Sequence, residues 1–168
     1  FVLETQKPPV MEVREWARVN RKSQKPLLNL SQAAPLSPPP DNLLKFLSEQ
    51  AILPENHLYG DVLGDTPLRE EIVNLWEKEY GSSICINNVA ITSGCNQAFC
   101  AAISTIASAG DSILVPVPWY FNHEMWLTMQ GIDIKPIPCD LNMLPDIKMA
   151  KKLLDKKTKA IVMVTPNN

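Results

Sequence analysis

The stretch GDSILVPVPWYFNHEMWLTMQGIDIKPI, residues 110–137, decides the fold class. It predicts a short apolar strand over 112–115, a helix over 122–130 that a glycine ends, and a second strand over 132–137. Pro136 places the second strand at an edge of the sheet, because proline cannot donate a hydrogen bond to a neighbouring strand. Elements of these lengths in this order indicate two parallel strands joined by a helical crossover.

The same alternation continues on both sides of this stretch. Upstream it predicts a strand over 89–92 and an Ala-rich helix over 96–109. Downstream it predicts an amphipathic helix over 145–156 and an apolar strand over 160–164. Repeated strand–helix units are typical of α/β proteins. We therefore expect a three-layer α/β fold, with a mainly parallel sheet and helices on both of its faces.

The N-terminal part has a different composition. Seven of the fifteen prolines fall in residues 1–42, which predict a short helix over 10–21 and a strand over 27–30. More regular helices follow, one that Asp41 caps and one with Thr66 as its N-cap and proline at its first position.

The overall composition is that of an ordinary globular protein, with 168 residues, 45% apolar, 20% charged and a net charge of −2. No basic run stands out, which argues against nucleic acid, and polar residues interrupt the longest uncharged stretch, 86–110, which argues against a membrane span. The four cysteines form no C-x-x-C pair and only two histidines are present, so a metal site has weak support.

No basic start with an apolar leader is present, so we expect a cytoplasmic protein. Because the chain begins at Phe1 and stops at Asn168 after an apolar run, we expect it to be part of a longer protein.

Ligands of parallel sheets bind beyond the carboxyl ends of the strands, so the residues that follow each strand are candidates for a site. Ser93, Gly94, Cys95 and Asn96 follow the first predicted strand and open a helix. Free N–H groups and the helix dipole at such a point favour an anion such as phosphate. A plain strand-to-helix turn with Ser93 as its N-cap explains the same residues.

Aromatic and amide side chains supply further candidates. The rings of residues 119–121 either stack on a planar ligand or pack under the next helix. Tyr59, in the glycine-containing loop 59–65, reaches either a ligand or water. Asn167 and Asn168 after the last strand are either ligand contacts or turn residues.

Five motifs follow one another along the chain: Tyr59…Gly64…Leu68-Arg69, then Ile91-Thr92-Ser93-Gly94-Cys95-Asn96-Gln97-Ala98, then Gly110-Asp111, then Pro118-Trp119-Tyr120, then Pro166-Asn167-Asn168. In this order they resemble the class I/II aminotransferases, which are fold-type I pyridoxal-phosphate enzymes, over about residues 26–168. The resemblance implies pyridoxal 5'-phosphate as cofactor, an amino acid and a 2-oxo acid as substrates, and a homodimer with a shared site. It also implies that residues 1–42 are an N-terminal arm and small-domain segment, and that residues 43–168 are the first half of the cofactor-binding large domain.

The same resemblance implies roles for single residues. Ser93 to Asn96 would hold the cofactor phosphate through backbone N–H groups, and Tyr120 would stack on the pyridine ring. Asn168 would hydrogen-bond the phenolic oxygen of the cofactor, and Tyr59 would reach the phosphate of the neighbouring subunit. Ala33 would lie in the segment that lines the substrate carboxylate, where many relatives carry Gly.

The family also uses a Lys that carries the cofactor as a Schiff base. None of the twelve lysines directly follows a predicted strand or has the serine-rich context of that motif, so we expect no catalytic residue in this chain, which alone would be an inactive half-site. Three alternatives stay open. They are a pyridoxal-phosphate-dependent lyase or aminocyclopropane-carboxylate synthase-like enzyme on the same fold, a non-catalytic cofactor-binding or regulatory domain, and a nucleotide-binding domain, which the absent G-x-G-x-x-G disfavours.

Overall fold

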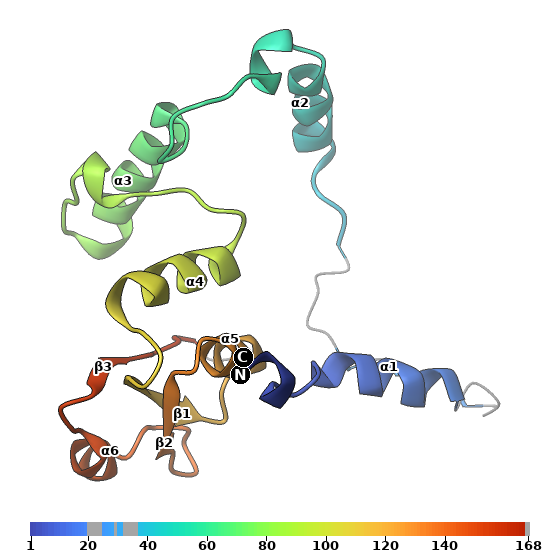
Figure 1. The fold of residues 1–168 in the computed structure, drawn as a ribbon. Helices are drawn as coiled ribbons and strands as arrows, with labels where there is room; N and C mark the ends of the chain where they lie inside the picture. Colours follow the sequence, from blue (N-terminus) through green and yellow to red (C-terminus); the bar gives the residue numbers. More distant parts are fainter. Residues whose placement is uncertain (20–24, 29, 32–36, 167–168) are drawn as a thin grey trace. The chain divides into compact units, whose positions relative to one another are not determined.

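The computed structural model describes residues 1–19, 25–28, 30–31 and 37–166 (Figure 1). The chain forms two compact units, one made of Phe1–Arg18 with Ser93–Asn168 and the other of Val19–Thr92. We call the first the sheet unit and the second the helical unit, and describe each by itself. The expected domain boundary between residues 42 and 43 remains a prediction.

Three parallel strands form the centre of the sheet unit: β1 (Ser112–Val117), β2 (Asp133–Pro138) and β3 (Thr158–Ile161). Their order is β2-β1-β3, so β1 lies between the other two. Ile113 of β1 stands opposite Ile134 of β2. The predicted parallel pairing is confirmed, and so is the edge position of the strand that contains Pro136.

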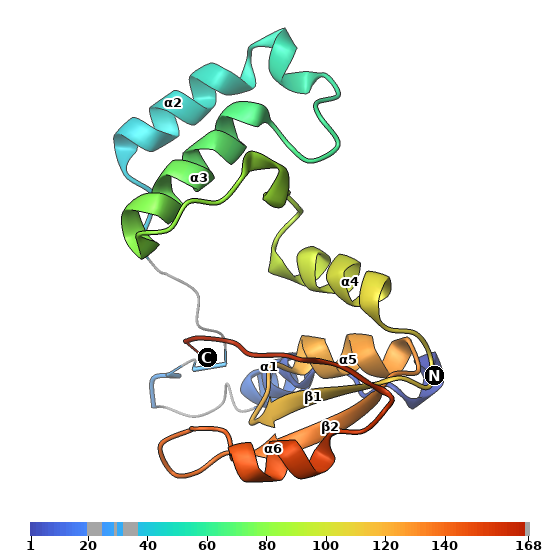
Figure 2. The same ribbon diagram turned by 90° about the vertical axis from the view of Figure 1, so that its left-hand side faces the viewer.

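Helices cover both faces of this sheet. They are α4 (Cys95–Ile106), α5 (Phe121–Met129) and α6 (Ile147–Leu153), and the N-terminal 3-10 helix η1 (Val2–Glu4) and helix α1 (Pro9–Val19) precede them in the chain. Figure 2 shows α5 and α6 on opposite sides of the strands. The three-layer α/β arrangement expected from the sequence is therefore present.

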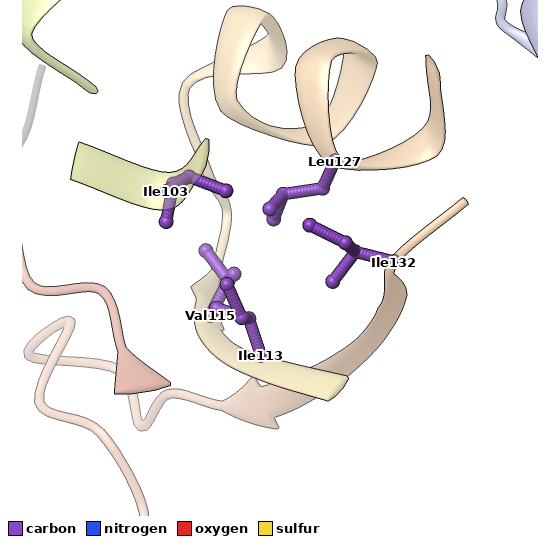
Figure 3. Packing of buried hydrophobic residues seen from close by; sticks show 5 residues of the cluster. All are labelled: Ile103, Ile113, Val115, Leu127 and Ile132. Atoms are coloured by element: carbon purple, nitrogen blue, oxygen red, sulfur yellow. The ribbon is translucent and has the colours of Figure 1, made fainter. Parts of the chain in front are cut away.

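The larger hydrophobic cluster lies on the α4 and α5 side of the sheet. Ile113 and Val115 of β1 contact Ile103 of α4, Leu127 of α5 and Ile132, and all five are buried (Figure 3). Successive side chains of a strand point to opposite faces, so residues two apart along β1 share this cluster.

The smaller cluster lies on the opposite face. Leu114, between the two β1 residues of the first cluster, packs with Ile137 of β2 and Ala150 of α6. β1 is thus buried on both faces, as its uninterrupted apolar sequence predicts for a central parallel strand.

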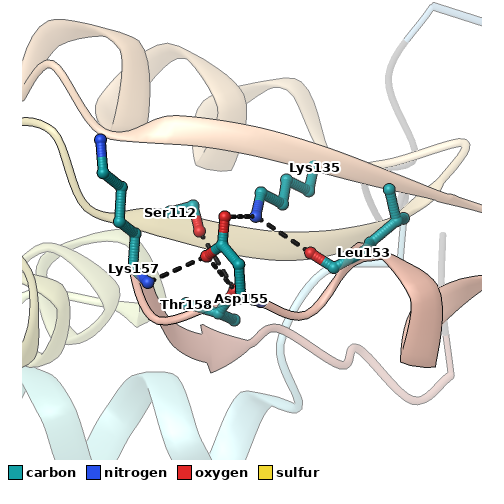
Figure 4. Close-up of polar contacts among 6 residues, drawn as sticks. All are labelled: Ser112, Lys135, Leu153, Asp155, Lys157 and Thr158. Atoms are coloured by element: carbon teal, nitrogen blue, oxygen red, sulfur yellow. Dashed lines mark hydrogen bonds and ion pairs between the residues drawn. The ribbon is translucent and has the colours of Figure 1, made fainter.

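A polar cluster joins the strand ends near α6 (Figure 4). Lys135 of β2 donates a hydrogen bond to the Leu153 carbonyl oxygen over 2.9 Å, and its Nζ lies 2.7 Å from the Asp155 carboxylate. Asp155 also accepts hydrogen bonds from the Lys157 backbone N–H and the Thr158 hydroxyl. The hydrogen bond from Lys135 lowers the pKa of Asp155 to about 2.

The helical unit contains α2 (Asp41–Ala51), η3 (Pro54–His57), α3 (Thr66–Tyr80) and η4 (Ile86–Asn88). Arg69 of α3 is 4% exposed, and its guanidinium donates to the carbonyl oxygens of Val89 and Ile86, each over 2.9 Å. Its third nitrogen lies 3.5 Å from the Asp61 carboxylate. A buried guanidinium needs such partners, because an unpaired charge in the interior is strongly destabilising.

Gly64 lets the loop before α3 approach the following segment closely. Its φ is +97°, and a Cβ at this position would lie 2.5 Å from the Ile91 side chain. The backbone also joins the two segments, because the Ile91 N–H donates to the Leu63 carbonyl oxygen. Glycine at position 64 is therefore required by both conformation and space.

Two predicted strands are wrong. Residues 89–92 form no strand, since the Ile91 N–H donates to the Leu63 carbonyl oxygen and the Val89 N–H to the Ile86 carbonyl oxygen, and neither bond belongs to a ladder between strands. Of the predicted strand 27–30, the described residues 27, 28 and 30 are also outside any strand.

Several helix ends differ from the sequence prediction. The N-cap of α3 is Asp65 rather than Thr66, so proline stands at the second helical position. The Ala-rich helix ends at Ile106, before the predicted residue 109, because the Asp111 carboxylate accepts the Ser108 N–H and forms a turn there. α6 is shorter than predicted at both ends: Asp146 caps its start by accepting the Met149 N–H, and Leu154 after its last residue has extended backbone.

Candidate functional site

A cavity of about 490 Å³ opens at the carboxyl ends of the strands in the sheet unit. The residues that line it lie in the last part of β1 or follow β1, β2 and β3, which is where ligands of parallel sheets bind. Most of the lining residues are apolar. The complete lining is Val115, Pro116, Pro118, Trp119, Tyr120, His123, Cys139, Met143, Leu144, Pro145, Val162, Met163, Val164, Thr165 and Pro166. The peptide bonds before Pro118 and Pro166 are cis.

Tyr120 is the N-cap residue of α5 and lies on the wall of this cavity. Its ring contacts that of Phe121 at a centroid distance of 5.1 Å and meets His123 edge-on at 5.3 Å. Its hydroxyl accepts a hydrogen bond of 2.6 Å from Nδ2 of Asn122. The ring is thus held from two sides while part of it borders the cavity.

His123 places a second polar group at the cavity wall. Its ring stacks at a tilt on Phe99 of α4, with centroids 4.2 Å apart, and its Nδ1 is buried without a hydrogen-bond partner among the described residues. Burial lowers the pKa of His123 and so favours the neutral form of its ring. A buried polar nitrogen beside a cavity is a group that a polar ligand or a further side chain would satisfy.

Residues 93–96 form the start of α4, with all four exposed. Gly94 is the N-cap residue, and its φ of +87° and ψ of 171° are accessible essentially to glycine alone. A Cβ at Gly94 would meet no atom within 4 Å, so space stays open above this loop. The Ser93 N–H donates to the Gln97 side chain, whereas the alternative of Ser93 as N-cap is wrong, because Gly94 occupies that position.

Ring contacts connect helix α4 to Tyr120, whereas residues 93–96 themselves are not among the residues that line the cavity. Phe99, one turn into the helix that residues 93–96 open, touches His123, which in turn touches Tyr120. The helix that carries the candidate phosphate loop and the candidate stacking ring are therefore joined by direct ring contacts.

The other predicted site residues are placed differently. Tyr59 lies in the helical unit and is fully exposed. Ala33 and Asn168 lie outside the described residues. The roles that the resemblance implies for all of these residues remain predictions.

Sequence reasoning missed part of the cavity. His123, which lines the cavity, follows the aromatic cluster closely, and its position in the first turn of a helix after a strand was the available signal. The contribution of Cys139 and Met143 carried no sequence signal, because it depends on how the loop after β2 folds back through the bridge between Cys139 and Pro145.

Two negative observations apply to the described part of the chain. There, no three His, Cys, Asp or Glu side chains gather in a way that could hold a metal ion. No helix among the described residues combines the length and apolar character needed to cross a membrane.

The family model of aminotransferase class I and II matches residues 25–168. The chain belongs to this family. Curated members of the aminotransferase family with similar sequences include the glutamate-pyruvate aminotransferase AlaA of Haemophilus influenzae, 31% identical over 144 residues, which are 84% of this chain and 35% of that protein. A probable aspartate aminotransferase of Methanocaldococcus jannaschii is 31% identical over 110 residues, 66% of this chain and 29% of that protein.

Solved aminotransferases share the fold. Alanine aminotransferase from Pyrococcus furiosus matches with a TM-score of 0.88 and 26% identity, over 99% of this chain and 43% of that one. Substrate-bound BacF from Bacillus subtilis matches with a TM-score of 0.85 and 26% identity, again over 99% of this chain and 43% of that one. This chain spans less than half the length of these relatives. Because the relatives are aminotransferases, the alternatives of a lyase, a regulatory domain or a nucleotide-binding domain are not favoured.

Aminotransferases of this family imply pyridoxal phosphate, and the residues present fit that group. The apolar cavity suits a planar ring, and Tyr120 borders it. Open space above Gly94 at a helix start suits a phosphate, and the orphaned Nδ1 of His123 offers a polar contact at the wall.

Proposed function

We propose that this chain supplies the cofactor-holding part of a pyridoxal-phosphate-dependent aminotransferase, which moves an amino group between an amino acid and a 2-oxo acid. The observation that carries the proposal is the cavity at the carboxyl edge of the sheet, with Tyr120 on its wall. Ring contacts link Tyr120 to the helix that begins at Cys95.

The chain's own residues would bind and orient the cofactor. Backbone N–H groups of residues 93–96 would bind the phosphate, with the Ser93 N–H exchanging the Gln97 side chain for the ligand, and the positive end of the α4 dipole also favours an anion there. The face of Tyr120 would pack on the pyridine ring and fix its plane. The apolar lining, including Trp119 and Met163, would exclude water from that face. When bound, pyridoxal phosphate supplies the electron-withdrawing ring that makes loss of the amino acid α-proton feasible.

We also propose that this chain alone carries no lysine that bonds to the cofactor. No described lysine lines the cavity. Lys135 is engaged with Asp155 and the Leu153 carbonyl, and Lys159 lies 3.6 Å from Asp111. The chain alone would therefore bind the cofactor without catalysing transfer.

The remaining roles complete the proposal. Tyr59, exposed in its loop, would reach the phosphate bound by a second copy in a homodimer, Asn168 would contact the phenolic oxygen, and Ala33 would lie by the substrate carboxylate. A cytoplasmic location and a role in amino acid metabolism belong to the same proposal. Cell fractionation with an antibody to the chain would test the location.

The experiment that tests the proposal is equilibrium dialysis of the 168-residue chain against pyridoxal phosphate, followed by borohydride reduction and intact-mass measurement. We expect retained cofactor that inorganic phosphate displaces, and no covalent adduct at a single site. A chain that retains no cofactor would overturn the cofactor-binding role. A single fixed adduct would instead contradict the half-site proposal and identify a reactive lysine, while leaving cofactor binding intact.

A further inference from the structure

We propose that Asn122 is a positioning residue, which sets the orientation of the Tyr120 ring at the cavity wall. This inference rests on the proposed function and deepens it. The Asn122 Nδ2 atom lies 2.6 Å from the Tyr120 hydroxyl oxygen and donates to it. The hydrogen bond is partly buried, so water competes with it less than at an open surface.

Secondary structure makes this contact available. Tyr120 is the N-cap residue of α5 with extended backbone, and Asn122 is the second residue of the helix. Side chains two apart within a helix do not face one another, but the extended N-cap residue allows its ring to fold back over the first turn. The contact therefore depends on the helix beginning at Phe121.

The Tyr120 side chain is fixed at its hydroxyl by a hydrogen bond and along its ring by aromatic contacts. The bond to Asn122 fixes the hydroxyl end, whereas Phe121 and His123 contact the ring itself. An aromatic ring without a tether at its hydroxyl would turn about its Cα–Cβ and Cβ–Cγ bonds within the space that the cavity leaves. Stacking needs one defined plane, so a preorganised ring costs less on binding.

The donor direction has a chemical consequence. A phenol that accepts a hydrogen bond from an amide N–H keeps its own O–H proton for a different acceptor. With Nδ2 of Asn122 as donor, the Tyr120 proton is directed away from Asn122 and is available to a polar atom of a bound molecule. Aspartate at position 122 would reverse this direction while keeping a tether.

The chain offers matched variants for a test. Asn122→Leu removes the hydrogen bond with little change in volume, and Asn122→Asp keeps an acceptor for the hydroxyl. Thr128→Val is the control, because it removes a hydrogen bond between Thr128 and Glu124 on the same helix without touching Tyr120. Tyr120→Phe removes the hydroxyl and keeps the ring.

The first readout requires no cofactor. The chain has three tyrosines, so fluorotyrosine labelling gives three fluorine NMR signals, and Tyr120→Phe assigns the one of interest. We expect Asn122→Leu to shift and narrow the Tyr120 signal, Asn122→Asp to restore its width, and Thr128→Val to leave it unchanged. A wild-type Tyr120 signal in a folded Asn122→Leu chain would overturn the tether.

The second readout is pyridoxal phosphate affinity by equilibrium dialysis. We expect Asn122→Leu to weaken binding about threefold to tenfold, the effect of one neutral hydrogen bond, and to have no further effect in the Tyr120→Phe background. Equal weakening in both backgrounds would contradict positioning through Tyr120. If the wild-type chain retained no cofactor, both the proposed function and the proposed effect of Asn122 on cofactor affinity would be wrong. The NMR measurement would still test whether Asn122 fixes the Tyr120 ring.

Discussion

The Arg69 guanidinium donates from Nε to the carbonyl oxygen of Val89 over 2.9 Å, and this bond crosses 20 positions of sequence within the helical unit. The same side chain holds the Ile86 carbonyl and faces Asp61, so α3, the loop before it and the segment after it meet at one cation. The loop carries Tyr59 two residues before Asp61. One buried side chain therefore organises, within the helical unit, the loop from which a phosphate contact of Tyr59 is proposed.

Removing this cation is expected to destabilise the helical unit strongly. Arg69→Met would leave the buried Val89 carbonyl and the partly buried Ile86 carbonyl without their donors, and is expected to cost about 2–4 kcal/mol in the free energy of unfolding. Arg18→Met is the control, because Arg18 pairs with Glu15 at an exposed site, and we expect it to leave the free energy of unfolding essentially unchanged. Urea unfolding followed by circular dichroism measures both, and equal small effects would contradict a structural role for Arg69.

The two faces of the sheet are expected to respond alike to loss of volume. Leu127→Ala in the larger cluster and Leu114→Ala in the smaller one remove side chains that are fully buried, and each is expected to cost about 2–5 kcal/mol. Leu141→Ala is the control, since that leucine is fully exposed, and it should stay within about 0.5 kcal/mol of the parent chain. Thermal and urea unfolding measure the three variants. A small effect at Leu114 would show that α6 is not packed as described.

Stability is expected to fall in acid through Asp155. Its pKa is lowered from 3.8 to about 2 in the folded chain, mainly by the hydrogen bond from Lys135. A carboxyl with a lowered pKa contributes stability that is fully present above its ordinary pKa and is lost as the pH falls from about 4 to about 2. Unfolding midpoints measured from pH 7 to pH 2 should therefore fall in this window.

Asp155→Asn should lower the midpoint at pH 7 and flatten that part of the profile. Lys135→Met removes the partner and should flatten it in the same way, and the double variant should add little to either single one. Two additive effects, or an unchanged acid profile in Asp155→Asn, would argue that the Lys135–Asp155 pair does not contribute to folding.

Alanine substitution at two glycines with nearly equal φ can distinguish the effect of backbone strain on stability from the effect of a lost ligand contact on cofactor binding. Gly94 and Gly110 have φ values of +87° and +88°, and a Cβ at either meets no atom within 4 Å. Alanine at each is expected to cost about 1–3 kcal/mol through backbone strain. Only Gly94→Ala is expected to weaken pyridoxal phosphate binding, by about fivefold or more, because it reorients the N–H groups at the start of α4.

Equilibrium dialysis and thermal unfolding of the two alanine variants make the comparison direct. If Gly110→Ala weakened cofactor binding as much as Gly94→Ala, the loss would come from general destabilisation rather than from the phosphate loop.

Local sequence predicted those parts of the fold where one pattern was sufficient. The apolar run that forms β1 predicted a central strand, and the proline in β2 predicted an edge strand. Both predictions are confirmed. The segment 89–92 shows the limit of this reasoning, because its apolar residues account for the burial of Val89 but do not provide a neighbouring strand. A strand is defined by its partner, and that property is not local.

The candidate site divides in the same way. Tyr120 could be placed at the cavity from its position after a strand, and the phosphate loop from its glycine and the helix that follows. The contact of His123 with Phe99 could not, because it depends on the crossing of α4 and α5. The lowered pKa of His123 results from the burial of its ring, so it could not be predicted from the sequence either.

The alternation of Ile113, Leu114 and Val115 between two cores has a consequence for how this chain can change during evolution. β1 should accept apolar replacements of similar volume, yet a single-residue insertion or deletion within Ser112–Val117 would send each side chain beyond it to the opposite core. A change of length in the turn at residues 140–144, where Leu141 is fully exposed, would alter the cavity wall at Met143 and Leu144 but would leave both cores in register. Length variation among descendants of this sequence should therefore accumulate in that turn and be absent from β1.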